Sequence, residues 1–374
     1  MIVVPHHVAR PAPPLIVTPG PRQASFGLVA GRVGWSAERV VVRVGSQVRA
    51  SRKPRGRHFS FYLRLPPRDV SIRVTAVDAR DRAASSVVRP VLGLSPRAAP
   101  RFVRAHRDGR LSRIVTTLAR GFPGTAAAYV EDLRTGAGAA WNARARFPAA
   151  STLKLAIAVE VLRRLGGQPP AAGTSLASLM DAMLIHSDNE AANQLLVFLG
   201  GSTGYGGAQV TSMARSIGLT DTEMFGGYIP GTAKRPPRIP LAVTSQPSFG
   251  IGKSTTAWDL ARLMRYVDLA AAGKGPLAVH FPSFTAADAR YLLYELAHVQ
   301  EPGRIGRFMP HAVRVAHKAG WISTARHDNG IVFWHGGSFL VTVMTWSPSG
   351  TGATSDLLAG RIARATLRFV KHRR

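Results

Sequence analysis

Hydrophobic and polar positions alternate along the first quarter of the chain. Between residues 24 and 94, three runs of β-branched and aromatic residues have the length of strands, at residues 40–44, 59–65 and 70–77. Segments rich in Pro, Gly and charged residues separate these runs and are typical of turns. The pattern predicts a small all-β sandwich over residues 24–95, preceded by a disordered lead-in over residues 1–23.

The spacing of apolar residues changes to a helical period after a Pro-containing linker at residues 94–100. Leu111, Val115 and Leu118 share one face of a predicted helix at residues 109–120. A hairpin is predicted at residues 126–142. Further helices are predicted at residues 151–162, 175–185, 190–199, 256–267 and 355–371, and a strand is predicted at residues 339–344. This mixture indicates an α+β domain over residues 101–374.

Composition supports a folded protein with two domains. The chain has 374 residues, of which 45% are hydrophobic. No apolar run approaches the ~18 residues needed to span a bilayer. The start of the sequence lacks a cationic region followed by an apolar one, so no signal peptide is visible. The absence of cysteine excludes disulfides, thiol catalysis and cysteine-ligated metal.

The formal net charge of +29 is the most unusual bulk property. It is spread over both predicted domains, with +13 on residues 1–100 and +16 on residues 101–374. Three interpretations are open: a compositional bias towards arginine, an anionic cell-wall or cell-surface partner, or a nucleic acid. Because no recognition motif accompanies the charge, specific nucleic-acid binding is not expected.

Ser151 and Lys154 lie at the predicted start of a helix. Pro148 disfavours helix at the residue before it, and small residues then lead into an apolar stretch. A spacing of three residues places the two side chains one turn apart. Serine needs a base to become a strong nucleophile, and lysine becomes that base only if burial or nearby cations lower its pKa. The pair is therefore a candidate nucleophile and base.

Two further clusters follow in the chain, Ser187-Asp188-Asn189 and Lys318-Ala319-Gly320. The tripeptide Ser-Asp-Asn is expected by chance only about 0.05 times in a chain of this length. With the Ser-x-x-Lys pair, the clusters match the motifs of class A β-lactamases and penicillin-binding proteins. Residues 101–374 therefore resemble the class A β-lactamase and penicillin-binding DD-peptidase superfamily of serine hydrolases. The all-β segment resembles an immunoglobulin-like module, either a wall-binding or glycan-binding module or a spacer.

The resemblance implies a fold and a set of roles. The fold is an antiparallel sheet flanked by helices, with a helical subdomain on the other face. Ser151 is the implied nucleophile and Lys154 its base, while Ser187 relays a proton and Lys318 supplies a second cation. The backbone N–H groups of Ser151 and Trp321 form the implied oxyanion hole. The implied substrate-binding residues are Asn189, Gly320, Trp321 and Ser323.

Two departures from the family pattern affect the expected reaction. Ala319 stands where the family has a hydroxyl residue that binds a substrate carboxylate, and Ser323, Thr324 or Arg326 are candidate replacements. Class A enzymes also deacylate with a glutamate on a loop after the second motif. Here Glu223 falls several residues early, and Gly227-Tyr228 lie near the expected position. Glu223 is a candidate deacylation base or an ordinary loop residue, and without a poised carboxylate we expect slow turnover.

The expected function is serine acyl transfer at a β-lactam or similar amide through an acyl-enzyme on Ser151. One alternative is a DD-peptidase-like or specialised cell-wall peptide or ester hydrolase with poor β-lactam deacylation. Another is a non-catalytic wall-binding protein that keeps the fold. The expected partners are β-lactams, peptidoglycan stem peptides and an anionic wall polymer, and no metal or organic cofactor is implied. Because such substrates lie outside the cytoplasmic membrane, we expect an extracytoplasmic location.

Overall fold

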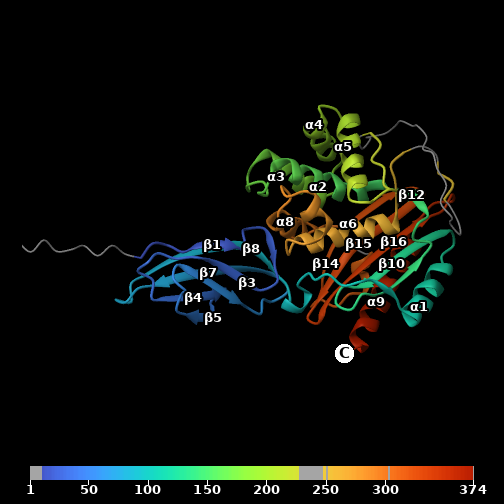
Figure 1. The fold of residues 1–374 in the computed structure, drawn as a ribbon. Helices are drawn as coiled ribbons and strands as arrows, with labels where there is room; N and C mark the ends of the chain where they lie inside the picture. The colour runs from blue at the N-terminus through green and yellow to red at the C-terminus, as the bar shows by residue number, and fades with distance from the viewer. Residues whose placement is uncertain (1–10, 227–246, 250–251, 302–303, 374) are drawn as a thin grey trace, which may run out of the picture. The chain divides into compact units, whose positions relative to one another are not determined.

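The computed structural model describes residues 11–226, 247–249, 252–301 and 304–373. It divides the chain into two compact units, Met1–Pro96 and Arg97–Arg374. The boundary lies at the short helix η1 (Pro96–Ala98), inside the predicted linker. Figure 1 shows an all-β first unit and a second unit of mixed helices and strands.

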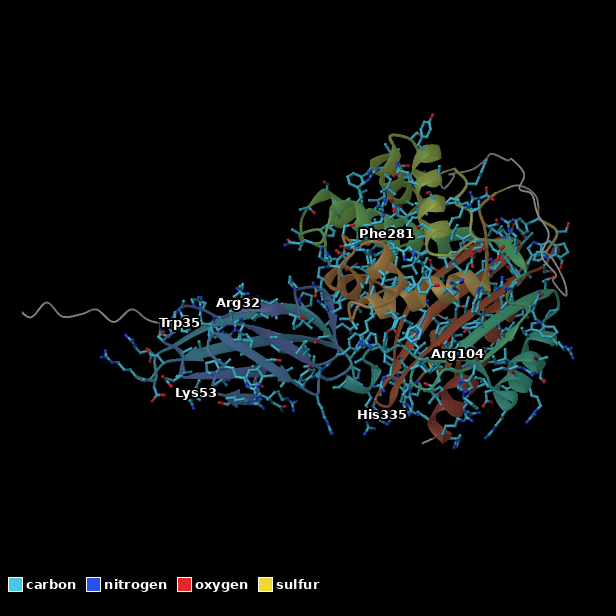
Figure 2. The ribbon with its side chains drawn as sticks, in the orientation of Figure 1. Arg32, Trp35, Lys53, Arg104, Phe281 and His335 are labelled. Atoms are coloured by element: carbon cyan, nitrogen blue, oxygen red, sulfur yellow. The ribbon has the colours of Figure 1, made fainter. Side chains whose placement is uncertain are left out.

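The first unit consists of two sheets around one core. Their strand orders are β1-β3-β6 and β2-β8-β7-β4-β5. The strands are β1 (Leu15–Thr18), β2 (Gln23–Ser25), β3 (Leu28–Arg32), β4 (Arg39–Val44), β5 (Gln47–Arg52), β6 (His58–Tyr62), β7 (Asp69–Val77) and β8 (Ala83–Gly93). Buried residues of both sheets, such as Val42 and Phe61, form the core. Arg32, Trp35 and Lys53 are exposed on this unit, as Figure 2 shows.

The strands predicted at residues 40–44, 59–65 and 70–77 correspond to β4, β6 and β7. The predicted lead-in over residues 1–23 is too long, because β1 pairs with β3 in antiparallel register, Leu15 opposite Arg32. The four residues Leu15-Ile16-Val17-Thr18, of which the last three have high β propensity, form this strand between prolines that suggested an irregular segment. The all-β unit therefore begins before residue 24.

The second unit is organised around a six-stranded sheet in the order β14-β15-β16-β10-β11-β9. Its neighbours pair antiparallel except β9 and β11, which are parallel. The strands are β9 (His106–Arg107), β10 (Thr125–Asp132), β11 (Ala137–Trp141), β14 (Arg314–Ile322), β15 (Ala325–Trp334) and β16 (Gly337–Trp346). The Lys318-Ala319-Gly320 cluster lies on β14, which is an edge strand.

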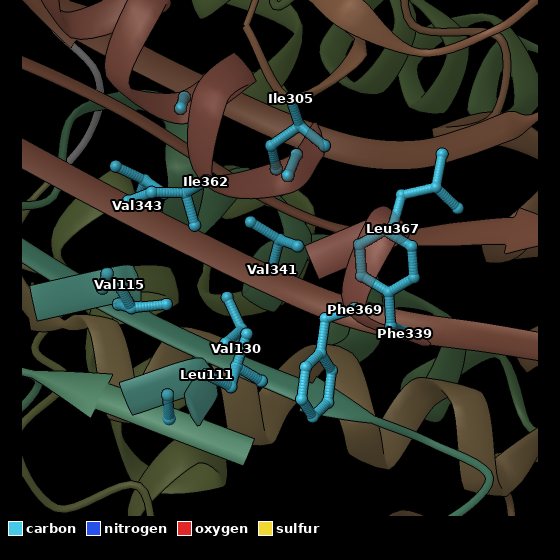
Figure 3. Packing of buried hydrophobic residues seen from close by; sticks show 14 of the residues in the cluster. Leu111, Val115, Val130, Ile305, Phe339, Val341, Val343, Ile362, Leu367 and Phe369 are labelled. Carbon is cyan, nitrogen blue, oxygen red and sulfur yellow. The ribbon is translucent and has the colours of Figure 1, made fainter. Parts of the chain in front are cut away.

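Two helices from opposite ends of this unit cover one face of the sheet. They are α1 (Gly109–Arg120) and α9 (Ala353–His372). Figure 3 shows their side chains, including Leu111 and Phe369, meeting Val130 and Val341 of the sheet. Fully burying one such side chain contributes about 1.5–3 kcal/mol to stability. This core supports the sheet from the side opposite the helical subdomain.

The other face of the sheet is covered by α6 (Ala257–Ala270), which contacts β10, β15 and β16. The helices α7 (Gly275–His280) and α8 (Ala286–Leu296) pack against α6. A separate group of helices consists of α2 (Lys154–Leu165) and its neighbours α3 (Ser175–Ile185), α4 (Asn189–Gly200) and α5 (Thr203–Ser216). The first nine residues of α2 are all buried. The unit also holds β12 (Arg146–Pro148), β13 (Ser254–Thr256), η2 (Ala150–Leu153) and η3 (Ile305–Phe308). Among the helices of the described ranges, none combines the length and apolar character needed to cross a membrane.

Candidate active site

Ser151 lies in the 3-10 turn η2, which leads directly into α2. The helix predicted from residue 151 is thus a tight turn followed by an α-helix. Residues three apart eclipse one another in a 3-10 helix. The backbone N–H of Lys154 donates to the carbonyl oxygen of Ser151 and so closes the turn. Ser151, which is half-buried, and the fully buried Lys154 therefore lie on one face of this turn.

The backbone just before Ser151 is held in an unfavourable conformation. Ala150 has φ of 48°, in the left-handed region that costs a non-glycine residue about 1–3 kcal/mol. The Ala149 N–H donates to the Lys253 carbonyl oxygen at 2.8 Å. The Thr152 hydroxyl donates to the Ala149 carbonyl oxygen at 2.5 Å. These bonds offset the strain and fix the direction in which the turn presents Ser151.

A buried histidine ties the sheet to the same segment. His327 on β15 is buried, which lowers its pKa to about 4 and keeps the ring neutral at pH 7. Its Nε2–H donates to the Pro148 carbonyl oxygen at 2.7 Å, and its Nδ1 accepts the Thr345 N–H at 3.3 Å. These two bonds assign the tautomer. They fasten β12, immediately before η2, to β15 and β16.

Gly320 brings the edge strand against the nucleophile turn. A Cβ at this position would lie 2.6 Å from the backbone nitrogen of Ser151 and 2.7 Å from that of Thr152. No other residue fits there without moving the turn. Trp321 follows Gly320 on β14, and its side chain is 59% exposed. The close approach sets the edge strand and the first N–H groups of η2 beside one another.

The three motif clusters meet at Ser187. Lys154 Nζ donates to the Ser187 carbonyl oxygen at 2.5 Å and to Asn189 Oδ1 at 2.7 Å. It also lies 3.4 Å from Ser187 Oγ. Lys318 Nζ donates to that same Oγ at 2.9 Å and to the Ala319 carbonyl oxygen at 3.1 Å. The Ser187 hydroxyl therefore lies between the Nζ atoms of two buried lysines.

The turn that carries Ser187 joins α3 to α4. Ser187 has φ of 57°, a second left-handed non-glycine residue in the site. The Asp188 N–H donates to the Ala182 carbonyl oxygen at 2.9 Å, which closes the end of α3. The exposed Asp188 carboxylate accepts the Ala191 N–H at 2.6 Å and caps α4. Such a cap contributes about 1 kcal/mol and holds Ser187 and Asn189 in place.

Burial, and then the charge of Lys318, lower the pKa of Lys154 to about 7. The carboxylates of Asp188 and Glu301 act in the opposite direction. Burial also lowers the pKa of Lys318. Around neutral pH a large fraction of Lys154 is therefore neutral and able to accept a proton. A lysine with this pKa suits a general base.

Other sequence candidates lie away from this cluster or have other partners. Ser323 is exposed in the turn between β14 and β15, where its carbonyl oxygen accepts the Thr351 N–H at 3.0 Å. Arg326 donates to Asp356 Oδ1 at 2.8 Å. The Glu223 carboxylate lies 3.5 Å from Arg146 Nη2, and its backbone pairs with Ser254. Gly227-Tyr228 lie outside the described residues.

Glu301 belongs to no sequence motif, and its place in the site becomes apparent only from the structure. Its Oε1 lies 3.6 Å from Lys318 Nζ, and its Oε2 lies 3.3 Å from Arg304 Nη1. Because no motif spacing links these positions, only the folded chain brings this acid to the site. Within the described ranges, no group of three or more His, Asp or Glu side chains could hold a metal ion.

The sheet, its two helical layers and the tight turn against the edge strand define a β-lactamase/transpeptidase-like fold. The model of the beta-lactamase enzyme family matches residues 110–168 and 164–370. The chain belongs to the beta-lactamase enzyme family.

Solved structures support the fold. PBP-A has a TM-score of 0.57 and 20% identity, and the match covers 72% of this chain and 98% of that chain. The beta-lactamase from Sphaerobacter thermophilus has a TM-score of 0.54 and 20% identity, over 70% and 97%. The class A beta-lactamase from Mycobacterium abscessus has a TM-score of 0.55 and 20% identity, over 70% and 99%. No curated protein matches the chain significantly.

Proposed function

We propose that the second unit is a serine acyl-transfer hydrolase that opens a β-lactam or a similar amide through an acyl-enzyme on Ser151. The observation that carries this proposal is the meeting of Lys154 and Lys318 on the Ser187 hydroxyl, beside the turn that holds Ser151. Membership of the beta-lactamase enzyme family supports a serine hydrolase.

In the proposed acylation, neutral Lys154 accepts the proton of the Ser151 hydroxyl as Oγ attacks the amide carbonyl. The backbone N–H groups of Ser151 and Trp321 stabilise the negative oxygen of the tetrahedral intermediate. The C–N bond then breaks, and the leaving nitrogen takes the proton of the Ser187 hydroxyl. Protonated Lys154 returns a proton to Ser187, from which it is separated by 3.4 Å. Asn189 binds the amide of the substrate side chain.

Deacylation separates two candidate functions. A carboxylate that activates water must lie within hydrogen-bond reach of that water, and the Glu223 carboxylate lies against Arg146, 3.5 Å from Nη2. This pairing favours an enzyme that acylates readily and deacylates β-lactams slowly, as expected for a peptidase or esterase of cell-wall substrates. The structure of a PBP-A variant as an acyl-enzyme complex with penicillin G supports acylation by penicillins within this fold.

The proposed substrates suggest an extracytoplasmic location. β-Lactams and peptidoglycan stem peptides are met outside the cytoplasmic membrane. A net charge of +29 would also attract anionic wall polymers at low salt. Retention on an anionic polymer column that is lost at moderate salt would support this partner, and absence of retention would contradict it.

Intact mass spectrometry after incubation with penicillin G tests the proposal. Acylation adds the mass of the penicillin, and Ser151→Ala abolishes this adduct. Ser216→Ala is the matched control, because the Ser216 hydroxyl only donates to the Met213 carbonyl at the end of α5. A stable adduct supports the slow deacylation proposed above. Rapid loss of antibiotic without an adduct supports a true β-lactamase, and no change in protein or antibiotic contradicts both on this substrate.

A further inference from the structure

Glu301 brings a negative charge to the cationic end of the candidate site. Its two carboxylate oxygens lie 3.6 Å from Lys318 Nζ and 3.3 Å from Arg304 Nη1. A carboxylate that bridges two cations in this way occupies the position that an anionic ligand of Lys318 would take.

Described residues before and after Glu301 in the chain form hydrogen bonds to other elements of the unit. The Gln300 N–H donates to the Ile185 carbonyl oxygen at 3.1 Å, at the end of the helix that leads to Ser187. On the other side, Arg304 Nη1 donates to the His327 carbonyl oxygen at 3.1 Å. The Ile305 N–H donates to Asp328 Oδ2 at 3.1 Å. Gln300 is thus bonded to the end of α3, and Arg304 and Ile305 are bonded to β15.

Burial and charge leave little capacity for a second anion. The side chains of Lys318 and Arg304 are 0% and 5% exposed, whereas that of Glu301 is 21% exposed. Asp356 lies 3.3 Å from Arg304 Nε, so this guanidinium lies between two carboxylates. A substrate carboxylate that approached Lys318 would meet the like charge of Glu301, which is costly at short range.

We propose that Glu301 is a built-in carboxylate that holds the anion position beside Lys318, so that the site prefers amide or ester substrates uncharged at that position. This inference rests on the proposed acyl transfer at Ser151. Ala319 agrees with it, because the family resemblance places there a hydroxyl that binds a substrate carboxylate. The departure at Ala319 and the presence of Glu301 then have one explanation, a substrate without that carboxylate.

The same carboxylate acts on the base. Its negative charge raises the pKa of both lysines and so opposes the effect of burial. Removing this charge lowers the pKa of Lys154. The acid limb of the pH–rate profile of acylation therefore moves to lower pH. A purely structural ion pair far from the base does not produce this shift.

The first test needs no variant. Acylation of the full chain by penicillin G is compared with acylation by penicillin G methyl ester, which lacks only the negative charge. Each second-order rate constant is measured by intact mass and divided by the alkaline hydrolysis rate constant of that compound. We expect a normalised acid-to-ester ratio below one. A ratio above one overturns the inference.

The second test compares Glu301→Gln with Glu190→Gln. Glu190 is exposed on α4 and accepts from Gln194, so it is a matched control for the loss of one negative charge. We expect Glu301→Gln to raise the acid-to-ester ratio about tenfold, a change typical of removing a repulsive charge. We also expect it to move the acid limb of ester acylation to lower pH, with Glu190→Gln unchanged in both. A ratio that changes less than about threefold in folded Glu301→Gln overturns the inference. If this variant does not fold, the normalised acid-to-ester ratio of the unmodified chain decides whether the inference holds.

Failure of the proposed function gives a different result. If neither compound acylates Ser151, the acyl-transfer proposal fails on β-lactams, and calorimetric binding of the acid and the ester replaces the rate measurement. Tighter binding of the ester by the unmodified chain, reversed in Glu301→Gln, then supports the role of Glu301. Tighter binding of the acid by the unmodified chain, or no binding of either compound, overturns it.

Discussion

The two buried lysines of the candidate site are the same residue type in different surroundings. Three hydrogen bonds of Lys154 run to a carbonyl, an amide and a hydroxyl oxygen, on Ser187 and Asn189. Lys318 shares the Ser187 hydroxyl but also lies 3.6 Å from the Glu301 carboxylate. A neighbouring carboxylate favours the charged form of lysine, whereas neutral acceptors compensate less for burial. The Glu301 carboxylate beside Lys318 therefore distinguishes the surroundings of the two lysines, and Lys154 is the one that the proposed acylation uses as the base.

Removal of the base gives the largest expected effect. Lys154→Ala should slow acylation of Ser151 by about 10³-fold, because a positioned general base contributes about 10²–10⁴-fold. Stopped-flow or timed mass spectrometry measures the rate. Lys371→Ala on α9, where the side chain lies over the Trp334 ring, should leave it unchanged. Retention of a tenth or more of the rate in Lys154→Ala would assign the base to another group.

A disturbance of the nucleophile turn should come next. Gly320→Ala places a methyl group 2.6 Å from the Ser151 backbone nitrogen, so the turn must shift. We expect acylation to fall about 10²-fold, as for small displacements of reacting groups. Gly109→Ala at the start of α1 is the control, since a Cβ there has open space. Equal rates in both variants would mean that the edge strand does not position Ser151.

The pH dependence of acylation tests the assignment of the base. With the pKa of Lys154 at about 7, its neutral fraction rises with pH. The acylation rate should rise about tenfold between pH 6 and pH 8 and then level off. The measurement uses penicillin G methyl ester, so that the substrate carboxylate does not contribute. A rate that is flat over this range would contradict a lysine base with this pKa.

The smallest expected effect concerns Glu223. If the ion pair with Arg146 is its only role, Glu223→Gln should change acylation and deacylation by less than about twofold and stability by less than about 1 kcal/mol. Decay of the adduct by mass spectrometry and thermal unfolding measure these quantities. A deacylation rate that falls about 10²-fold would instead make Glu223 the deacylation base.

The main elements could be predicted because their signals are local. The helix at residues 109–120 and the strand of Val40 and Val42 follow from apolar spacing alone. β1 was missed, because four residues between prolines form a strand only when β3 pairs with them. The predicted helix start near Ser151 did not include the left-handed Ala150, since that conformation depends on bonds to distant segments.

The residues of the candidate site also fall into those with a local sequence signal and those without one. The motifs identified Ser151, Lys154, Ser187 and Lys318, because each lies in a short cluster with a chemical reason for its spacing. Glu301 and His327 have no such cluster. Glu301 meets Lys318 because the segment before η3 packs beside β14, and His327 bonds to a residue 179 positions away in the chain. The residue types of the proposed reaction are therefore encoded in short motifs, whereas the charges and hydrogen bonds around them depend on the fold.

The complete burial of the first nine residues of α2 has a consequence for how activity is lost on heating. A helix with no solvent-facing stripe can open only when the surrounding helices separate from it, so its amide hydrogens should exchange with deuterium as slowly as any in the unit. Lys154 belongs to this helix, and its environment persists as long as the helix does. Heat inactivation should therefore coincide with cooperative melting of the second unit instead of preceding it.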